Sequence, residues 1–271
     1  MPITLMTHSV TDGVHTRVPP LVIAHRGASA HWPENTMPAF AAGIEQGADM
    51  IEIDLHMSRD GRLIVIHDDS LERTTDARHV YPDRSNLRIA SMTAAEIAAL
   101  DAGSWKSPTF AGTQVPHLAE VLALVHATRT GLLLEVKHPR QYPGIAEAIV
   151  RSFAEVPGYL GRALAAGLLV VQSADWDFVR DFHALAPDIP VGLLGRPGPE
   201  ELREFANWVD QINPHRGEAD AEFLHSVHEL GMSSLVWTID ETAEMERAID
   251  FGADGIITNV PDRLLAMVEE I

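Results

Sequence analysis

Two segments of the sequence place charged side chains two residues apart within apolar runs. Glu52 and Asp54 lie in the run MIEIDL, and Glu135 and Lys137 end the run LLLEVK. Side chains two positions apart on a β-strand share one face, and carboxylates on a buried face are costly unless a cation holds them. Because Mg²⁺ and Ca²⁺ prefer oxygen ligands, the spacing indicates a site for one hard divalent cation. His56 shares the face of Glu52 and Asp54 and is a rival ligand, although it lies nearer the following turn.

A predicted hairpin brings a second histidine to these carboxylates. The runs at 50–57 and 62–67 are joined by only four residues, whereas a parallel crossover needs a dozen or more. The pair Asp60-Gly61 is typical of a two-residue hairpin turn, so we expect an antiparallel return strand. This turn would set Asp54 opposite His67, and a shift in register would set His67 opposite a neighbour of Asp54. Taken alone, His67 would more often be a surface or core histidine.

Short apolar runs alternate with helix-length stretches rich in Ala, Leu and Glu. The runs lie at 21–24, 50–55, 63–66, 132–136, 168–172, 191–194, 208–212, 234–239 and 254–258. The helical stretches lie at 36–47, 117–128, 144–155, 175–186, 199–206, 219–230 and 241–250. Such alternation is typical of βαβ units and a parallel sheet. With the return strand set aside, eight strands remain, and 271 residues suit a single (β/α)8 (TIM) barrel.

Polar residues recur where the predicted strands end, which is where such barrels carry their active sites. His25-Arg26-Gly27 ends the first strand, Trp237-Thr238 the seventh and Thr258-Asn259 the eighth. Trp237 taken alone fits barrel packing, and the Glu52–Asp54 pair taken alone fits a structural ion-pair network. The recurrence of an acidic group on the next barrel strand, with few matching cations, favours a cation site.

The expected organisation is a flexible leader at 1–20 and one barrel domain at 21–271. The leader lacks the charged start and apolar middle of a signal peptide. Residues 70–116 interrupt the alternation with several Pro and Gly residues and one short helical piece at 93–100. We expect this stretch to be a small inserted subdomain over one end of the barrel.

The composition limits the partners and the compartment. A formal net charge of −19 would repel nucleic acid and anionic membrane surfaces, so an anionic substrate would need local positive charge. The absence of cysteine excludes disulfides and thiolate metal sites and fits a reducing compartment. No apolar run is long enough to span a bilayer. We therefore expect a cytoplasmic protein that acts on a small molecule, with no nucleic-acid partner and no stable membrane insertion. Its oligomeric state stays open.

Several motifs together resemble the glycerophosphodiester phosphodiesterase family. They are HRGASAHWPENTMPAF (25–40), GADMIEIDLHMSRDGRLIVIHDDSLERTTD (47–76), VPHLAEVL (115–122), LLLEVK (132–137), VQS (171–173), VWTID (236–240) and GADGIITNVPD (252–262). They follow in the order of that family and cover roughly residues 21–265. The family is expected to share the barrel and an extra subdomain like the insertion at 70–116. The sequence departs from the family at Ser173-Ala174, where Ser-Phe is usual, and at Thr258-Asn259, where Thr-Asp is usual.

The resemblance implies an activity and a role for each site residue. The implied reaction is metal-dependent hydrolysis of a glycerophosphodiester to sn-glycerol 3-phosphate and an alcohol. The resemblance implies His25 and His67 as the acid–base pair and Glu52, Asp54 and Glu135 as ligands of one divalent ion (Mg²⁺ or Ca²⁺). It implies Arg26 and Lys137 as phosphate contacts, Glu34 in the signature loop as a support of His25 or of the metal, and Trp237 as an aromatic wall for the glycerol.

Three alternatives remain. A related barrel phosphodiesterase could act on lysophospholipids in the manner of a phospholipase D, which requires an apolar entry rim. A barrel aldolase could use Glu52 and Asp54 to hold Mg²⁺, but it would not need both His25 and His67. A barrel that only binds ligands would not need the full set of charged positions.

Overall fold

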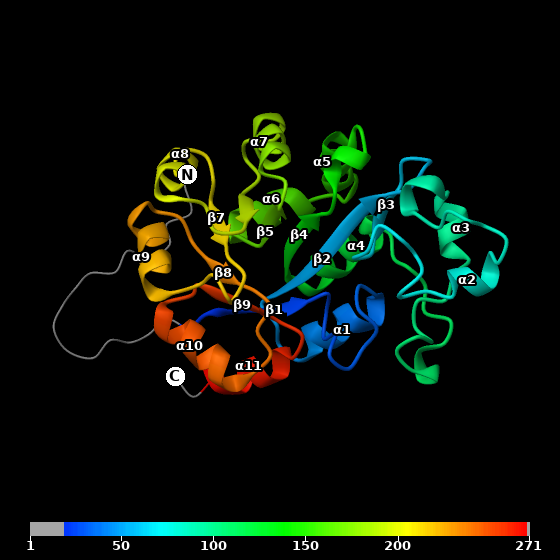
Figure 1. Cartoon of the computed structure of the whole chain (residues 1–271), viewed down its shortest axis with the longest axis horizontal. Helices are drawn as coiled ribbons and strands as arrows, with labels where there is room; N and C mark the ends of the chain where they lie inside the picture. The colour runs from blue at the N-terminus through cyan, green and yellow to red at the C-terminus, as the bar shows by residue number, and fades with distance from the viewer. Residues whose placement is uncertain (1–18, 270–271) are drawn as a thin grey trace.

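Eight parallel strands form the centre of the computed structural model, which describes residues 19–269 (Figure 1). Their order around the sheet is β7-β6-β5-β4-β2-β1-β9-β8. The strands are β1 (Leu21–His25), β2 (Met50–Met57), β4 (Gly131–Val136), β5 (Leu169–Ser173), β6 (Val191–Leu194), β7 (Gln211–Asn213), β8 (Leu235–Val236) and β9 (Gly255–Thr258). Most of the expected leader, residues 1–18, lies outside the described residues.

The two ends of the strand order meet and nearly close the ring. Isolated parallel bridges join Gln211 to Ser233 and His215 to Trp237, and the Ile212 N–H donates to the Ser233 carbonyl at 3.0 Å. These bridges connect β7 with β8. The predicted (β/α)8 barrel is therefore confirmed.

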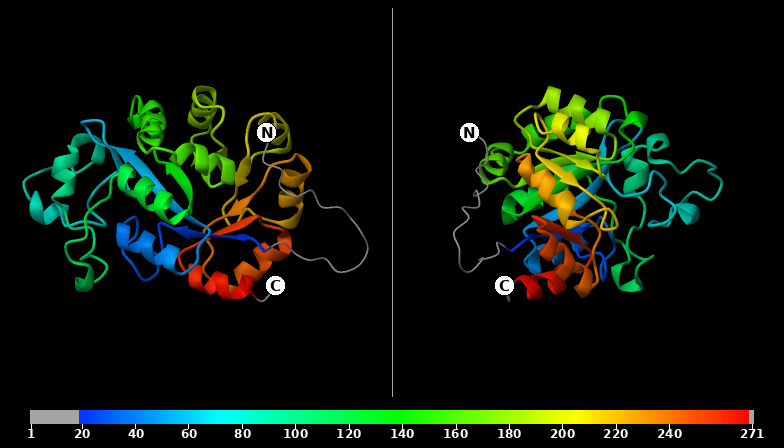
Figure 2. Two further views of the ribbon diagram at one scale, coloured as in Figure 1. Left: turned by 180° about the vertical axis from the view of Figure 1, so that it is seen from behind. Right: turned by 60° about the vertical axis from the view of Figure 1, so that its left-hand side comes forward.

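Helices surround the strands on the outside, as the views in Figure 2 show. They are α1 (Met37–Glu45), α4 (Leu118–Thr128), α5 (Ile145–Glu155), α6 (Tyr159–Ala166), α7 (Trp176–Leu185), α8 (Pro199–Phe205), α9 (Ala221–Glu229), α10 (Thr242–Phe251) and α11 (Pro261–Val268). The sequence did not predict α6 or α11. In α6, the preceding Pro157-Gly158 and the internal Gly161 weaken the helical pattern. Among the described residues, no helix combines the length and the hydrophobicity needed to cross a bilayer.

The interior of the barrel changes from apolar to polar along the strands. One buried cluster takes an inward side chain from each of six strands: Ile23, Met50, Leu133, Val170, Leu235 and Ile257. Strand side chains repeat every second residue on a face, so the next inward position on each strand lies two residues further on. Those positions carry His25, Glu52, Glu135, Gln172, Trp237 and Asn259. The barrel interior therefore holds a layer of polar and aromatic side chains directly above the apolar cluster, which we call the apolar floor.

Strand β3 (Leu63–Val65) pairs with β2 in the antiparallel sense, but the expected register is wrong by one residue. The Ile66 N–H donates to the Asp54 carbonyl at 3.0 Å, so Ile66 faces Asp54 and His67 lies one position beyond. The Ser58 N–H donates to the Arg62 carbonyl at 2.8 Å, which leaves three residues in the turn instead of two. Three-residue hairpins of this kind end on a residue with positive φ, and Gly61 has a φ of 77°.

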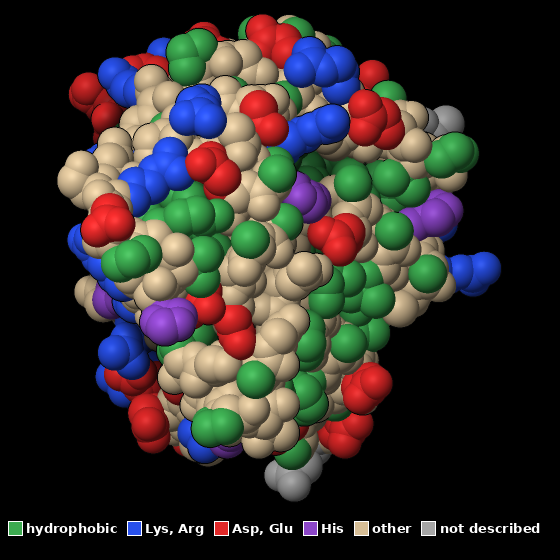
Figure 3. All heavy atoms as spheres, turned by 90° about the vertical axis from the view of Figure 1, so that its right-hand side faces the viewer, with side chains coloured by type: hydrophobic (Ala, Val, Ile, Leu, Met, Phe, Trp, Pro, Cys, Tyr) green, Lys and Arg blue, Asp and Glu red, His purple; other side chains and the backbone are tan. Residues whose placement is uncertain are grey.

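The segment between β3 and α4 packs on its own small core. It contains α2 (Ala77–Val80), α3 (Ala94–Ala98) and two short 3-10 turns, η1 (Ile89–Ser91) and η2 (Pro108–Phe110). Its buried side chains, such as Leu71, Ile89 and Met92, form a separate cluster. In Figure 1 the segment lies at the right, beyond β3. Figure 3 views the molecule from this side and shows acidic and basic side chains interspersed with small hydrophobic groups.

Candidate active site

Three carboxylates converge in the polar layer of the barrel. Glu52 and Asp54 are buried on β2, and the β2–β4 register sets Glu135 beside Asp54. One potential ligand atom from each residue lies within 4.8 Å of the others. Glu52 Oε1 and Asp54 Oδ1 are buried and have no hydrogen-bond partner among the described residues. Buried oxygens without partners are costly, so the three side chains fit a hard divalent cation.

The proton affinities of the three carboxylates differ sharply without a cation. Burial raises the pKa of Glu52 well above its usual value, and the negative charges of Asp54 and Glu135 raise it further. Burial and Asp54 likewise raise the pKa of Glu135 to about 7. Burial alone would also raise the pKa of Asp54, but Arg26 and Lys137 outweigh it and lower that pKa to about 2. Without further positive charge, the site does not favour three ionised carboxylates, and a bound cation would supply that charge.

Arg26 and Lys137 supply the positive charges of this site. The Arg26 backbone N–H donates to Glu52 Oε2 at 3.0 Å, and its Nε lies 3.0 Å from Asp54 Oδ2. Lys137 Nζ lies 2.7 Å from Glu135 Oε1 and 3.6 Å from Asp54 Oδ1. Both side chains are mostly buried. Their charges can therefore act on an anionic ligand despite the strongly acidic protein.

His25 is held in one tautomer by Asn259. His25 Nδ1 lies 2.7 Å from Asn259 Oδ1, and Asn259 Nδ2 donates to Asp240 Oδ2 at 2.6 Å. Because a carboxylate only accepts hydrogen bonds, Asn259 must turn its amide nitrogen toward Asp240 and its amide oxygen toward His25. His25 then donates from Nδ1, which leaves Nε2 without a proton in the neutral ring. Burial lowers the pKa of His25 to about 4, and the charge of Arg26 adds to that effect. At neutral pH His25 is therefore an uncharged ring able to accept a proton.

His67 faces a carboxylate instead. Its Nδ1 lies 2.7 Å from Asp68 Oδ1, and Asp68 also accepts from Arg73 Nε at 2.7 Å. The hydrogen bond from Arg73 holds the pKa of Asp68 well below its usual range, against the effect of burial, and His67 contributes in the same direction. Asp68 is thus an anion that only accepts hydrogen bonds, so His67 Nδ1 carries the proton of this contact. The other ring nitrogen, Nε2, takes no part in it.

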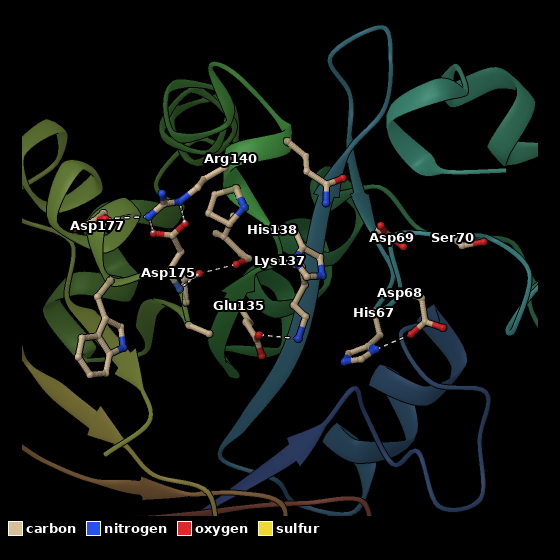
Figure 4. A pocket seen from close by; sticks show the side chains of 16 residues that line it. His67, Asp68, Asp69, Ser70, Glu135, Lys137, His138, Arg140, Asp175 and Asp177 are labelled. Carbon is tan, nitrogen blue, oxygen red and sulfur yellow. Dashed lines mark hydrogen bonds and ion pairs between the residues drawn. The ribbon is translucent and has the colours of Figure 1, made fainter. Parts of the chain in front are cut away.

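A cavity of about 940 Å³ opens beside this site. Figure 4 shows the side chains of Glu135, Lys137 and His67 directed toward the same space, with Arg140 and Asp175 at its far side. Arg140 contacts both Asp175 and Asp177 there. The cavity gives a ligand a path from solvent to Glu135, Lys137 and His67.

The comparisons with known proteins agree with this geometry. The sequence model of the Glycerophosphoryl diester phosphodiesterase family matches residues 25–263. The chain belongs to this family. It is 34% identical over 253 residues to a glycerophosphodiester phosphodiesterase of Caldanaerobacter subterraneus, covering 92% of this chain and 98% of the relative. It is 32% identical over 256 residues to a glycerophosphodiester phosphodiesterase of Bacillus subtilis, covering 89% and 84%.

A solved structure of similar fold carries a ligand. An Oleispira antarctica phosphodiesterase, in complex with the product sn-glycerol-3-phosphate, superposes with a TM-score of 0.81 and 26% identity. The match covers 93% of this chain and 97% of that one. The family assignment thus rests on sequence and fold together, and this glycerophosphoryl diester phosphodiesterase family member is an enzyme of the phosphoric diester hydrolase class.

The structure brings together most of the predicted site residues of this family member. Glu34 accepts hydrogen bonds from Arg26 Nη1 at 3.0 Å and from Arg73, so it supports the site through these two arginines. Among residues 19–269, no hydrogen bond joins it to His25 or to the three carboxylates. Trp237 packs against the apolar floor, and its Nε1 donates to the Asn213 carbonyl at 2.8 Å.

His56 is excluded as the rival metal ligand. Its Nδ1 lies 2.8 Å from the Tyr142 hydroxyl, and its Nε2 lies 3.0 Å from the His67 carbonyl. Because the carbonyl only accepts, Nε2 carries the proton and Nδ1 accepts from the hydroxyl. Both ring nitrogens are thus engaged. Burial lowers the pKa of His56 to about 4, which keeps the ring neutral.

The two departures from the family sequence have different consequences in this chain. Asn259 takes the position of the usual Asp and serves as the acceptor for His25. Ser173 Oγ donates to the Val136 carbonyl at 2.7 Å and so braces β4 against β5. Ala174 lines the cavity where the family usually has Phe, which leaves that wall with a smaller side chain.

Four supporting residues were not predicted. Asn35 holds Asp54 from two sides, with Nδ2 donating to Oδ2 at 2.8 Å and Oδ1 accepting from the Asp54 N–H at 3.2 Å. The others are Asp68, Arg73 and Asp240. Asn35, Asp68, Arg73 and Asp240 all lie within the quoted family motifs, but their partners are distant in sequence and the motifs do not identify them.

Proposed function

We propose that this chain hydrolyses glycerophosphodiesters to sn-glycerol 3-phosphate and an alcohol with one bound divalent cation, Mg²⁺ or Ca²⁺. The observation that carries the proposal is the buried cluster of Glu52, Asp54 and Glu135, flanked by Arg26 and Lys137. The product complex of the Oleispira antarctica neighbour supports the identity of the phosphate product.

The charged residues suit an anionic phosphodiester. Glu52, Asp54 and Glu135 would hold the cation, which when bound supplies Lewis-acid stabilisation of the charge on the phosphoryl oxygens. Arg26 and Lys137 would contact the same phosphate and fix its orientation. With a net charge of −19, the protein depends on this local group of positive charges to bind the substrate.

The two histidines suit opposite proton-transfer roles. His25 is neutral with Nε2 bare, so it would accept the proton of the attacking hydroxyl. His67 is oriented by the Asp68 carboxylate at its Nδ1, and we assign to it the donation of a proton to the leaving alkoxide. Both rings lie near enough to Asp54 to influence its pKa, so both are close to the carboxylate cluster.

The test is product identification with glycerophosphocholine and Mg²⁺ or Ca²⁺. Phosphorus NMR should show sn-glycerol 3-phosphate, with an equal amount of choline released. Glu52→Gln should abolish turnover, while Glu45→Gln, at an exposed position on α1, should not change it. Formation of phosphocholine and glycerol, or full activity of Glu52→Gln, would contradict the proposal.

A further inference from the structure

Arg73 makes two forked contacts with carboxylates on different parts of the site. Its Nη1 and Nη2 donate to Glu34 Oε2 and Oε1 at 3.0 and 2.8 Å. Its Nε and Nη2 donate to Asp68 Oδ2 and Oδ1 at 2.7 and 3.0 Å. Only the planar guanidinium of arginine offers donors in such a fork. One side chain thus joins the loop after β1 to the segment after β3.

Each of these carboxylates touches one residue of the proposed chemistry. Glu34 Oε1 accepts from Arg26 Nη1 at 3.0 Å, and Asp68 Oδ1 lies 2.7 Å from His67 Nδ1; Figure 4 marks the second contact with a dashed line. Hydrogen bonds therefore link five side chains in a continuous series, in the order Arg26, Glu34, Arg73, Asp68 and His67. The two ends are a phosphate contact and a proton-transfer residue.

The inserted segment fixes the backbone beside Arg73. Leu71 is fully buried in the core of that segment, and its N–H donates to the Leu87 carbonyl at 3.0 Å. Thr74, on the other side of Arg73, is also buried. Two anchored neighbours limit the freedom of Arg73, so its guanidinium is presented to Glu34 and Asp68 at low entropic cost.

The contacts of Arg73 differ from an ordinary surface ion pair. Isolated exposed pairs contribute little to stability, but Glu34 is only 15% exposed and both contacts of Arg73 are forked. Burial would raise the pKa of Glu34, yet the hydrogen bonds and charges of Arg73 and Arg26 lower it. Charge-assisted forked pairs fix geometry as well as charge. Their main effect here is on the orientation of the groups at either end.

We propose that Arg73 is a positioning residue that orients His67 through Asp68 and Arg26 through Glu34, so that the inserted segment aligns the proton donor with the phosphate contact. The inference rests on the proposed function. Misplacement of a reacting group by about 1 Å can cost about 10²-fold in rate. The Asp68 contact should affect kcat, because it acts on proton transfer. The Glu34 contact should affect KM, because it acts on phosphate binding.

The first experiment compares Arg73→Gln with the matched control Arg78→Gln. Arg78 lies in α2 of the same segment and pairs with Glu72 on an exposed surface, away from the site. With glycerophosphocholine as substrate, Arg73→Gln should lower kcat by about 10- to 100-fold and raise KM. The control should keep both constants, and thermal melting should show both proteins folded. Equal constants for the two variants would overturn the inference, whereas an inactive wild type would overturn the proposed function instead.

The second experiment separates the two contacts. In the Asp68→Asn background, Arg73→Gln should cause no further loss of kcat but should still raise KM, because the contact through Asp68 is already removed. If the loss of kcat in the double variant equals the product of the losses in the two single variants, Arg73 does not act through Asp68. Arg73→Lys tests the same point if the glutamine variant does not fold. A lysine keeps the charge but lacks the fork, so at least a tenfold loss in kcat/KM is expected, and wild-type activity would overturn the inference.

Discussion

Replacing Glu135 with Gln should remove a pH-dependent loss of stability from the cation-free protein. Burial and the charge of Asp54 raise the pKa of Glu135 from 4.5 to about 7. Between these pH values the folded protein keeps a proton that the unfolded chain has released, so raising the pH favours unfolding. At 1.36 kcal/mol per pH unit, the penalty fully developed above pH 7 is roughly 3 kcal/mol. A glutamine at position 135 cannot ionise, so the variant does not carry this penalty.

The assay is urea unfolding of EDTA-treated wild type and Glu135→Gln at pH 5 and pH 8. His25 and His56 have lowered pKa values and titrate in the opposite sense, so they stabilise the fold as the pH rises. They are present in both proteins, so the informative quantity is the difference in unfolding free energy between the two. Because part of the penalty has already developed at pH 5, that difference should move by roughly 2.5 kcal/mol in favour of the variant from pH 5 to pH 8. A difference that does not change with pH would show that the folded protein does not raise the pKa of Glu135.

Three further predictions concern catalysis and the loop that follows β1. His25→Ala and His67→Ala should each lower kcat by about 10²–10⁴-fold with little change in melting temperature; near-normal kcat would mean that the histidine is misassigned. We also expect the substrate's own glycerol 2-hydroxyl to attack, because an internal nucleophile is already oriented. The alcohol would leave, and water would then open the cyclic phosphate to sn-glycerol 3-phosphate. A 2-deoxy analogue of glycerophosphocholine should then inhibit without being cleaved, and rapid hydrolysis would favour direct attack by water. Gly27→Ala should lower the unfolding free energy by more than about 1–2 kcal/mol, because Gly27 has a φ of 82° and an added Cβ would lie 2.4 Å from the Ala39 carbonyl carbon; unchanged urea unfolding would contradict this.

The alternation within single strands made the carboxylate site predictable. Glu52 and Asp54 sit in a run whose other members are apolar, and period two alone places them on one face. The same rule applies to Glu135 and Lys137. The barrel topology makes β2 and β4 neighbours, and the structure adds the register that sets Asp54 beside Glu135. The main elements of the candidate metal site could therefore be predicted from local signals and the barrel topology.

The turn register could not be predicted because a distant segment influences it. Asp60 Oδ1 accepts from the Ser58 hydroxyl at 2.7 Å and from the Ala94 N–H at 2.9 Å. Ala94 begins α3 in the inserted segment, 34 residues away. This contact holds Asp60 in a three-residue turn, whereas the Asp-Gly pair alone favours a two-residue turn. Local turn chemistry thus gave the hairpin but not its register.

The supporting hydrogen bonds were unpredictable for a similar reason. Asn259 lies 234 residues from His25, and Arg73 lies 39 residues from Glu34. No period or spacing rule links residues so far apart in sequence, and each pairing exists only because the barrel and the insertion bring the segments together. The sequence therefore offered candidates for the reacting groups but not the residues that orient them.

The most direct test of the account is the turnover of the protein after complete removal of divalent cations. Wild-type protein would be dialysed against EDTA, its metal content checked by elemental analysis, and the release of sn-glycerol 3-phosphate from glycerophosphocholine measured before and after addition of Mg²⁺ or Ca²⁺. The cluster of Glu52, Asp54 and Glu135 predicts no turnover without a cation and recovery when it is restored. Full activity in a sample shown to be free of metal would mean that the reaction does not require a cation.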